Sequence, residues 1–308
     1  MRTRSLIPAA VLSFGCSLHH RPVAPEPARG PARDSLFQLD QTRADSVASR
    51  GPVEGMLALL APDVAYLRAG VPAVFGREAA RLLFAASARS SATTVSWQPL
   101  GGGVSDDLRS AYTFGVTARI APARPELRAE RYVAYWERTR DQPWRIVAYV
   151  EVNGPTAIEV SPTRQQVAAP VRALPKPMAD AAATVRATDS LFSDLADRMG
   201  TAFAFSNTVD PYGAVFGTPQ LVIGPKAVEE FYAAQGNGTS LTWHPVYASA
   251  AGSLDLGFTI GDYSVTSRGA SGAAVQRFGK YLTVWKRQRD GAWKFVIVGG
   301  NGTPARAQ

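Results

Sequence analysis

The chain has 308 residues, of which 46% are hydrophobic and 19% charged, a composition typical of a globular protein with room for two domains. Its net charge of +8 lies mostly outside the regions expected to fold, because residues 34–154 carry 14 basic and 13 acidic side chains and residues 180–304 carry ten of each. A nucleic-acid-binding domain concentrates Lys and Arg on one surface, so this distribution argues against nucleic acid as a partner.

Residues 1–16, MRTRSLIPAAVLSFGC, begin with basic residues and continue with a short apolar run. This pattern predicts an export signal that is too short to span a bilayer as a helix. Gly15–Cys16 resembles the bacterial lipoprotein cleavage site, at which the cysteine is lipidated, so Cys16 is the candidate lipidation site of a periplasmic or cell-envelope lipoprotein whose only membrane contact is the lipid anchor. Plain secretion with an incidental cysteine, and no export at all, are the alternatives. Residues 17–33 are rich in Pro and Ala, and are predicted to be a disordered spacer.

The remaining sequence contains an internal repeat. The tetrapeptide DSLF occurs at 34–37 and 189–192, and longer matches follow, such as RYVAYWERTRDQPWRIV (131–147) with KYLTVWKRQRDGAWKFV (280–296). All six tryptophans fall into pairs separated by 146 to 149 residues: Trp97/Trp243, Trp136/Trp285 and Trp144/Trp293. The sequence therefore predicts tandem domains at 34–155 and 180–304, a Pro-rich linker at 156–179 and a short tail at 305–308.

Both halves predict the same order of elements. Helical segments are expected first, at 35–60 and 181–205, each beginning near its DSLF, followed by a short element around Asp63 or Asp210 and a second helix at 78–88 or 226–234. Strands follow, which in the second half are expected at 239–249, 254–267, 274–288 and 292–300. Helices followed by a run of antiparallel strands predict an α+β fold.

The segments LTWHPVYASAAGSLDLGFTIGDY (241–263) and GKYLTVWKRQRDGAWKFVIVGGNGTP (279–304) resemble the poorly characterised bacterial branch of the nuclear transport factor 2-like superfamily. That superfamily includes SnoaL-like polyketide cyclases and ketosteroid isomerases. The resemblance implies two tandem cone-shaped domains, each with N-terminal helices packed on a curved antiparallel sheet that can leave a pocket. Such cones commonly pair through their sheets, so the two domains are expected to pair within the chain, with a higher oligomer as an alternative. The first half matches more loosely, with Gln98 and Arg109 replacing His244 and Asp255.

The candidate catalytic residues are Asp210, Tyr281 and His244. In ketosteroid isomerase-like members an Asp near the pocket mouth is the general base, and this resemblance implies that role for Asp210, with Tyr281 donating to an oxyanion. The alternatives are a turn position for Asp210 and a core position for Tyr281. His244 alternates with Trp243 along a strand, so it points outward if Trp243 packs in the core.

The candidate ligand-binding residues combine polar and aromatic side chains on or near strands: Tyr212, Trp243, Asp262, Arg277 and Tyr281. Asp255 is expected to shape its own turn. The sequence has no phosphate-binding loop, dinucleotide motif or metal-spaced His/Cys cluster, so no cofactor and no metal is expected. The sequence thus predicts an exported protein that binds a small apolar or partly apolar molecule. The alternatives are an isomerase-, cyclase- or dehydratase-type enzyme and a purely structural or interaction module.

Overall fold

A computed structural model describes residues 26–88, 93–121, 124–139, 142–152, 180–216, 221–236, 239–269 and 271–303. The predicted leader with Cys16, the linker at 156–179 and the tail at 305–308 lie outside these ranges. Within the described residues, no helix combines the length and the apolar character needed to cross a membrane.

The first half contains four helices among its described residues, namely α1 (Glu26–Gln41), α2 (Arg43–Arg50), α3 (Pro52–Leu57) and α4 (Arg77–Ala88). Its strands are β1 (Leu60–Leu67), β2 (Val74–Phe75), β3 (Thr93–Val104), β4 (Ser110–Ala121), β5 (Arg124–Glu137) and β6 (Arg145–Val152). They form one sheet in the order β2-β1-β6-β5-β4-β3.

The second half repeats this plan. Its described helices are α5 (Ala181–Met199), α6 (Thr201–Thr208) and α7 (Pro225–Ala233). Its strands are β7 (Val209–Phe216), β8 (Leu221–Ile223), β9 (Ser240–Ala250), β10 (Leu256–Arg268), β11 (Ala274–Arg287) and β12 (Trp293–Thr303), in the sheet order β8-β7-β12-β11-β10-β9.

The predicted α+β class is confirmed, and one strand pairing differs from the expected antiparallel sheet. In each half the first strand after the helices pairs in parallel with the last strand, β1 with β6 and β7 with β12. The sheets are therefore mixed. In the first half the meander begins with β3, at the opposite edge of the sheet from β2, and runs back strand by strand until β6 lies beside β1; the second half has the same order.

The helical segment predicted in each half is divided by a glycine. Gly51 separates α2 from α3 and Gly200 separates α5 from α6, with φ angles of 82° and 89° that favour glycine. The first helix also begins at Glu26, within the stretch predicted to be a spacer, and it includes Pro31. Leu36 on this helix is fully buried, so packing of the helix against the sheet outweighs the unfavourable local composition.

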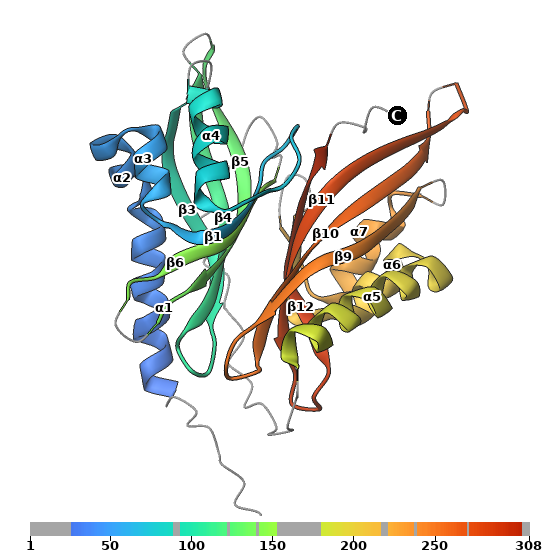
Figure 1. The fold of residues 1–308 in the computed structure, drawn as a ribbon. Helices are drawn as coiled ribbons and strands as arrows, with labels where there is room; N and C mark the ends of the chain where they lie inside the picture. The colour runs from blue at the N-terminus through green and yellow to red at the C-terminus, as the bar shows by residue number, and fades with distance from the viewer. Residues whose placement is uncertain are drawn as a thin grey trace, which may run out of the picture.

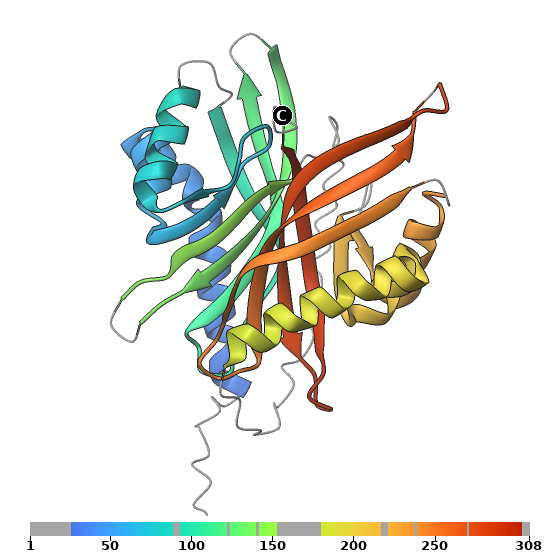
Figure 2. The same ribbon diagram turned by 45° about the vertical axis from the view of Figure 1, so that its right-hand side comes forward.

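The two sheets face each other, and the helices of each half cover the outer side of its sheet (Figures 1 and 2). One hydrophobic core lies between helices and sheet in each half, and a third lies between the two sheets. In this third core the ring of Tyr135 lies 4.6 Å from that of Phe258, and Phe114 lies 6.4 Å from Phe216. The two halves therefore share a continuous apolar interface.

Candidate functional site

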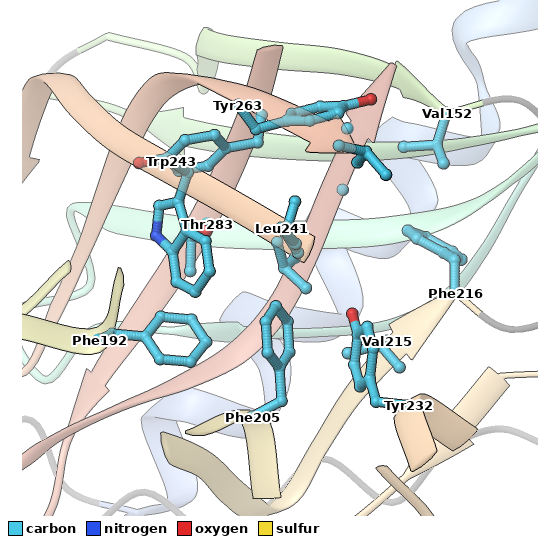
Figure 3. Close-up of a pocket in the computed structure, with 15 residues that line it drawn as sticks. Val152, Phe192, Phe205, Val215, Phe216, Tyr232, Leu241, Trp243, Tyr263 and Thr283 are labelled. Atoms are coloured by element: carbon cyan, nitrogen blue, oxygen red, sulfur yellow. The ribbon is translucent and has the colours of Figure 1, made fainter. Parts of the chain in front are cut away.

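A cavity of about 280 Å³ lies in the second half, between the helices and the concave side of the sheet. Figure 3 shows the rings of Phe205 and Tyr232 facing those of Trp243 and Tyr263, with Val152 and Phe216 at one end. The lining is mostly aromatic and aliphatic: Val152, Phe192, Phe205, Val215, Phe216, Tyr232, Leu241, Trp243, Tyr263, Val265, Tyr281, Thr283, Val298, Gly299 and Gly300.

The cavity exists because small residues in the second half replace two tyrosines of the first. Tyr66 pairs with Tyr149 between β1 and β6, and Val215 pairs with Val298 at the same place between β7 and β12. The two tyrosine rings stack at 5.0 Å inside the first cone, where both are buried. Both valines line the cavity of the second cone. Two Tyr-to-Val differences therefore leave space in the second cone that side chains fill in the first.

A third replacement also removes a side chain from the interior of the second cone. In the first half, the buried carboxylate of Glu151 accepts a hydrogen bond from the Tyr66 hydroxyl at 2.6 Å and lies 3.5 Å from Nε of Arg68. The equivalent residue of the second half is Gly300, which lines the cavity. A Cβ at Gly300 would lie 3.2 Å from the Tyr263 ring, so the absence of a side chain gives that ring its place in the wall.

The interior of the first cone is also occupied by a cation. The guanidinium of Arg43 is completely buried, and its Nη2 lies 2.6 Å from Oδ1 of Asp40. Burial opposes this charge, but Asp40 and the neighbouring tyrosines raise the pKa of Arg43 overall. The guanidinium lies 5.0 to 5.8 Å from the centres of four rings, a cation–π arrangement formed by Trp97, Tyr132, Trp136 and Tyr149.

Phe192 occupies the equivalent position in the second half, so the base of the cavity is apolar. Its ring lies 4.6 Å from that of Trp243 and 4.7 Å from that of Phe205. A buried ion pair in the first cone is thus replaced by an aromatic cluster in the second. The residues that line the cavity include no Arg and no Lys.

Beneath this cluster, Asp189 of α5 is fully buried and hydrogen-bonded. It accepts from the Tyr281 hydroxyl at 2.7 Å and from Nε1 of Trp243 at 2.9 Å. Burial raises the pKa of Asp189, while hydrogen bonds from Thr259, Tyr281 and Trp243 lower it, and burial has the larger effect. Asp189 therefore orients two residues of the cavity wall without lining the cavity itself.

Three hydroxyl groups belong to residues that line the cavity and make no hydrogen bond to another described residue: those of Tyr232, Tyr263 and Thr283. Burial raises the pKa of Tyr232 and of Tyr263, so both stay neutral at physiological pH. Each hydroxyl can donate or accept a hydrogen bond. The described wall thus offers neutral polar groups on an apolar surface.

The structure brings two of the predicted site residues, Trp243 and Tyr281, to the cavity wall. His244 is exposed on the opposite face of β9, as expected if Trp243 packs in the core. Three further candidates are exposed and do not line the cavity, namely Tyr212, Asp262 and Arg277.

Asp210, the candidate general base, is buried but is not part of the cavity wall. Its carboxylate accepts hydrogen bonds from the backbone N–H of Tyr212 and from Nε2 of Gln288, each at 2.9 Å. Asp255 stabilises its turn, as expected, by accepting from Ser253. It also accepts from the backbone N–H of Asp106 in the first half at 2.9 Å, so it links the two halves.

Asp189 was missed because the repeated DSLF is out of register with the fold. The structural counterpart of Asp189 is Asp40, which accepts a hydrogen bond from Tyr132 as Asp189 does from Tyr281. Both separations are 149 residues, the spacing of two tryptophan pairs, whereas the DSLF copies are 155 residues apart. Extending the tryptophan register back to the first helices would have paired the two aspartates.

No protein-family model matches the chain, and no curated protein matches it. Among solved structures, a ketosteroid isomerase-like protein from Erwinia carotovora atroseptica is 14% identical, with 41% of this chain and 98% of that one covered and a TM-score of 0.35. A nuclear transport factor 2-like superfamily protein from Salmonella enterica is 14% identical (41% and 95% covered, TM-score 0.33), and the CaMKII hub of S. rosetta is 19% identical (41% and 99% covered, TM-score 0.34). Each of these structures covers about two fifths of the chain, and the two halves share one arrangement of helices followed by a mixed six-stranded sheet.

Proposed function

We propose that the protein binds a small, neutral, partly apolar molecule in the cavity of its second cone. The observation that carries this proposal is the pair Val215 and Val298, which leaves a cavity where Tyr66 and Tyr149 fill the first cone. Well-formed apolar pockets with a few convergent polar groups are typical ligand sites. The first cone, filled by its own side chains, then serves as a structural partner for the second.

The size and lining of the cavity narrow the class of ligand. An engineered cavity of roughly 150 Å³ binds benzene, so a cavity of about 280 Å³ suits a molecule of about two fused rings. The free hydroxyls of Tyr232, Tyr263 and Thr283 favour a hydroxyl or carbonyl group on such a molecule. A carboxylate or phosphate would lose its hydration without gaining a cation from the described wall.

The residues that line the cavity support ligand binding better than they support catalysis. The residues that line it include no Asp, Glu, His or Lys, and the candidate base Asp210 is bonded elsewhere. The Tyr281 hydroxyl already donates to Asp189, so it is not available to donate to an oxyanion. An isomerase, cyclase or dehydratase would need a proton acceptor at the wall.

The proposal is tested by comparing the binding of naphthol with that of naphthoate to the full-length chain. Both have the same ring system, but only naphthoate is charged. We expect naphthol to raise the thermal midpoint with the logarithm of its concentration above its Kd and to saturate in calorimetry, with naphthoate binding at least tenfold more weakly. A saturating ligand at a hundred times its Kd stabilises by about 2.7 kcal/mol. Failure of both compounds and of the neutral arylamine N-phenylnaphthylamine to bind would contradict the proposal.

We further propose that the chain is exported through residues 1–16 and anchored by a lipid on Cys16. The basic start, short apolar run and single cysteine support this proposal. In a bacterial host, the full chain is expected in the detergent phase after phase partitioning, and Cys16→Ser is expected to be soluble or to retain its leader. Equal partitioning of both forms would contradict a lipid anchor.

A further inference from the structure

One residue of the cavity wall comes from the other half of the chain. Val152, at the end of β6, lines the cavity of the second cone, and Figure 3 shows its side chain at the end where Phe216 also lies. The side chain passes close over β12, because a Cβ at Gly299 would lie only 2.7 Å from Cγ2 of Val152. The absence of a side chain at Gly299 therefore lets the first half reach the cavity.

The neighbouring wall residue is held by the first half as well. Phe216 lines the cavity, and its ring centre lies 6.4 Å from that of Phe114 and 5.5 Å from the guanidinium of Arg131. Both of these partners are buried residues of the first sheet. The position of Phe216 thus depends on how the two sheets pack.

The last strand of the second half makes the reverse contact, with the first half. Asn301 is the counterpart of Val152, at the same point near the end of the last strand. Its Nδ2 donates to the backbone oxygens of Leu67 at 3.0 Å and Glu151 at 2.6 Å in the first half, and its Oδ1 accepts from Lys280 at 2.6 Å. Each last strand therefore ends against the other cone. Asn301 contacts the first cone through hydrogen bonds, whereas Val152 contacts the second cone as part of its apolar cavity wall.

We infer that the binding site of the second cone is composite, that Val152 of the first half selects the size of ligand it admits, and that ligand binding and sheet packing stabilise each other. This inference rests on the proposed binding function and assigns part of it to the first half. A ligand in contact with Val152 and Phe216 interacts with both halves at once. It must then favour the packed arrangement by the same factor by which packing favours the ligand.

The test measures binding of N-phenylnaphthylamine to the full chain by fluorescence. Val152→Phe is expected to weaken binding at least tenfold by occupying the end of the cavity. Val152→Ala removes two methyl groups from the wall and is expected to weaken binding of this probe by about fourfold for each group that contacts it. The matched control is Val246→Phe, an exposed valine of β9 that does not line the cavity. Val152→Ala also protects the test against poor folding of the larger variant.

A second readout, amide hydrogen exchange, separates a composite site from a site within the second half alone. The N–H of Gly70 donates to the oxygen of Gly302 across the interface at 2.9 Å, whereas the N–H of Arg138 bonds within the first half to Arg109. The probe is expected to slow exchange at Gly70 at least twofold in the wild-type protein, without affecting Arg138.

The outcomes distinguish the inference from the proposed function. If the wild-type protein binds the probe while both Val152 variants behave like Val246→Phe and Gly70 exchanges unchanged, the composite site is wrong and the binding function stands. If no neutral aromatic compound binds to the wild-type protein, the proposed function fails and the inference fails with it.

Discussion

Asp40 and Asp189 lie at equivalent positions on the first helices of the two halves, and each is fully buried against a strand tyrosine. Their remaining partners differ. Asp40 pairs with the guanidinium of Arg43, whereas Asp189 accepts from the indole of Trp243. The buried carboxylate at this position is therefore stabilised by a cation in the first cone and by neutral hydrogen-bond donors in the second. The second solution leaves the interior apolar and able to receive a neutral ligand.

Filling the second cone with two tyrosines, as in the first cone, should abolish ligand binding. The double variant Val215→Tyr/Val298→Tyr is expected to lose at least 90% of probe fluorescence at saturation, because the tyrosines can stack as Tyr66 and Tyr149 do. Its free energy of unfolding should change by no more than about 1–3 kcal/mol, the usual effect of overpacking. Fluorescence titration and urea unfolding check both expectations, with Val246→Tyr as the exposed control. Unchanged binding would show that the probe lies elsewhere.

Arg43 is predicted to be structural. Arg43→Ala leaves the carboxylate of Asp40 buried without its cationic partner, which should reduce the free energy of unfolding by about 3–5 kcal/mol. Arg43→Phe should cost less, because Phe192 fills the equivalent place and Nε1 of Trp97, which has no described partner, can turn to Asp40. Urea unfolding measures both, with exposed Arg50→Ala as the control on the same helix. Equal losses for Ala and Phe would contradict this account.

Asp255 should make the protein more stable in mild acid. Burial and the nearby Asp106 raise the pKa of Asp255 from 3.8 to about 6. The folded state therefore holds a proton that the unfolded state has released between these values, and stability falls as pH rises from about 4 to 6, by up to about 3 kcal/mol. Asp255→Asn should remove that part of the pH dependence. Its hydrogen bonds can persist, since the Asn oxygen can accept from Asp106 and the amide can donate to Ser253.

The Asp255 prediction is measured as the difference in unfolding free energy between wild type and variant across pH 4 to 7. The nearby charged groups Asp106, Asp107 and Lys286 are present in both proteins, so the two differ only in the group at position 255. Asp290→Asn is the control, because Asp290 is an exposed turn residue that also accepts from a nearby backbone N–H. A difference that does not vary with pH would contradict the prediction.

Tyr281 is predicted to support the site rather than to catalyse. Tyr281→Phe removes one of the donors to Asp189 and should destabilise the protein by about 1–3 kcal/mol. The loss should be larger at pH 8 than at pH 5, because the missing hydrogen bond favours the charged form of Asp189 and its pKa will rise further. Tyr247→Phe, at a half-exposed position on β9, is the control. A loss of the same size at pH 5 and at pH 8 would contradict this prediction.

Much of the fold could be predicted from the sequence because its signals are local and occur twice. The tryptophan pairs gave the duplication, and the alternation of β-branched and aromatic residues gave the strands of the second half. The division of the helices at Gly51 and Gly200 was missed, since helical periodicity continues across a residue that differs only in its φ angle. The parallel pairing of β1 with β6 was missed because it joins segments about 80 residues apart.

Of the candidate site residues, Trp243 and Tyr281 line the cavity, whereas Asp210, Tyr212, Asp262 and Arg277 do not. Alternation along a strand shows which residues share a face, and it correctly separated Trp243 from His244. It does not show whether a face meets the cone interior, the other sheet or solvent.

The sequence by itself determined that two related α+β domains follow one another, because the repeat and the strand pattern are properties of the chain. The tertiary structure decided which domain is hollow and which residues enclose the space. Tyr66 and Tyr149 fill a cone only because parallel strands place them side by side, and Val152 reaches the second cavity only because the two sheets pack closely over Gly299. A cavity is the space left by side chains that meet from distant segments, so its position follows from packing rather than from any local pattern.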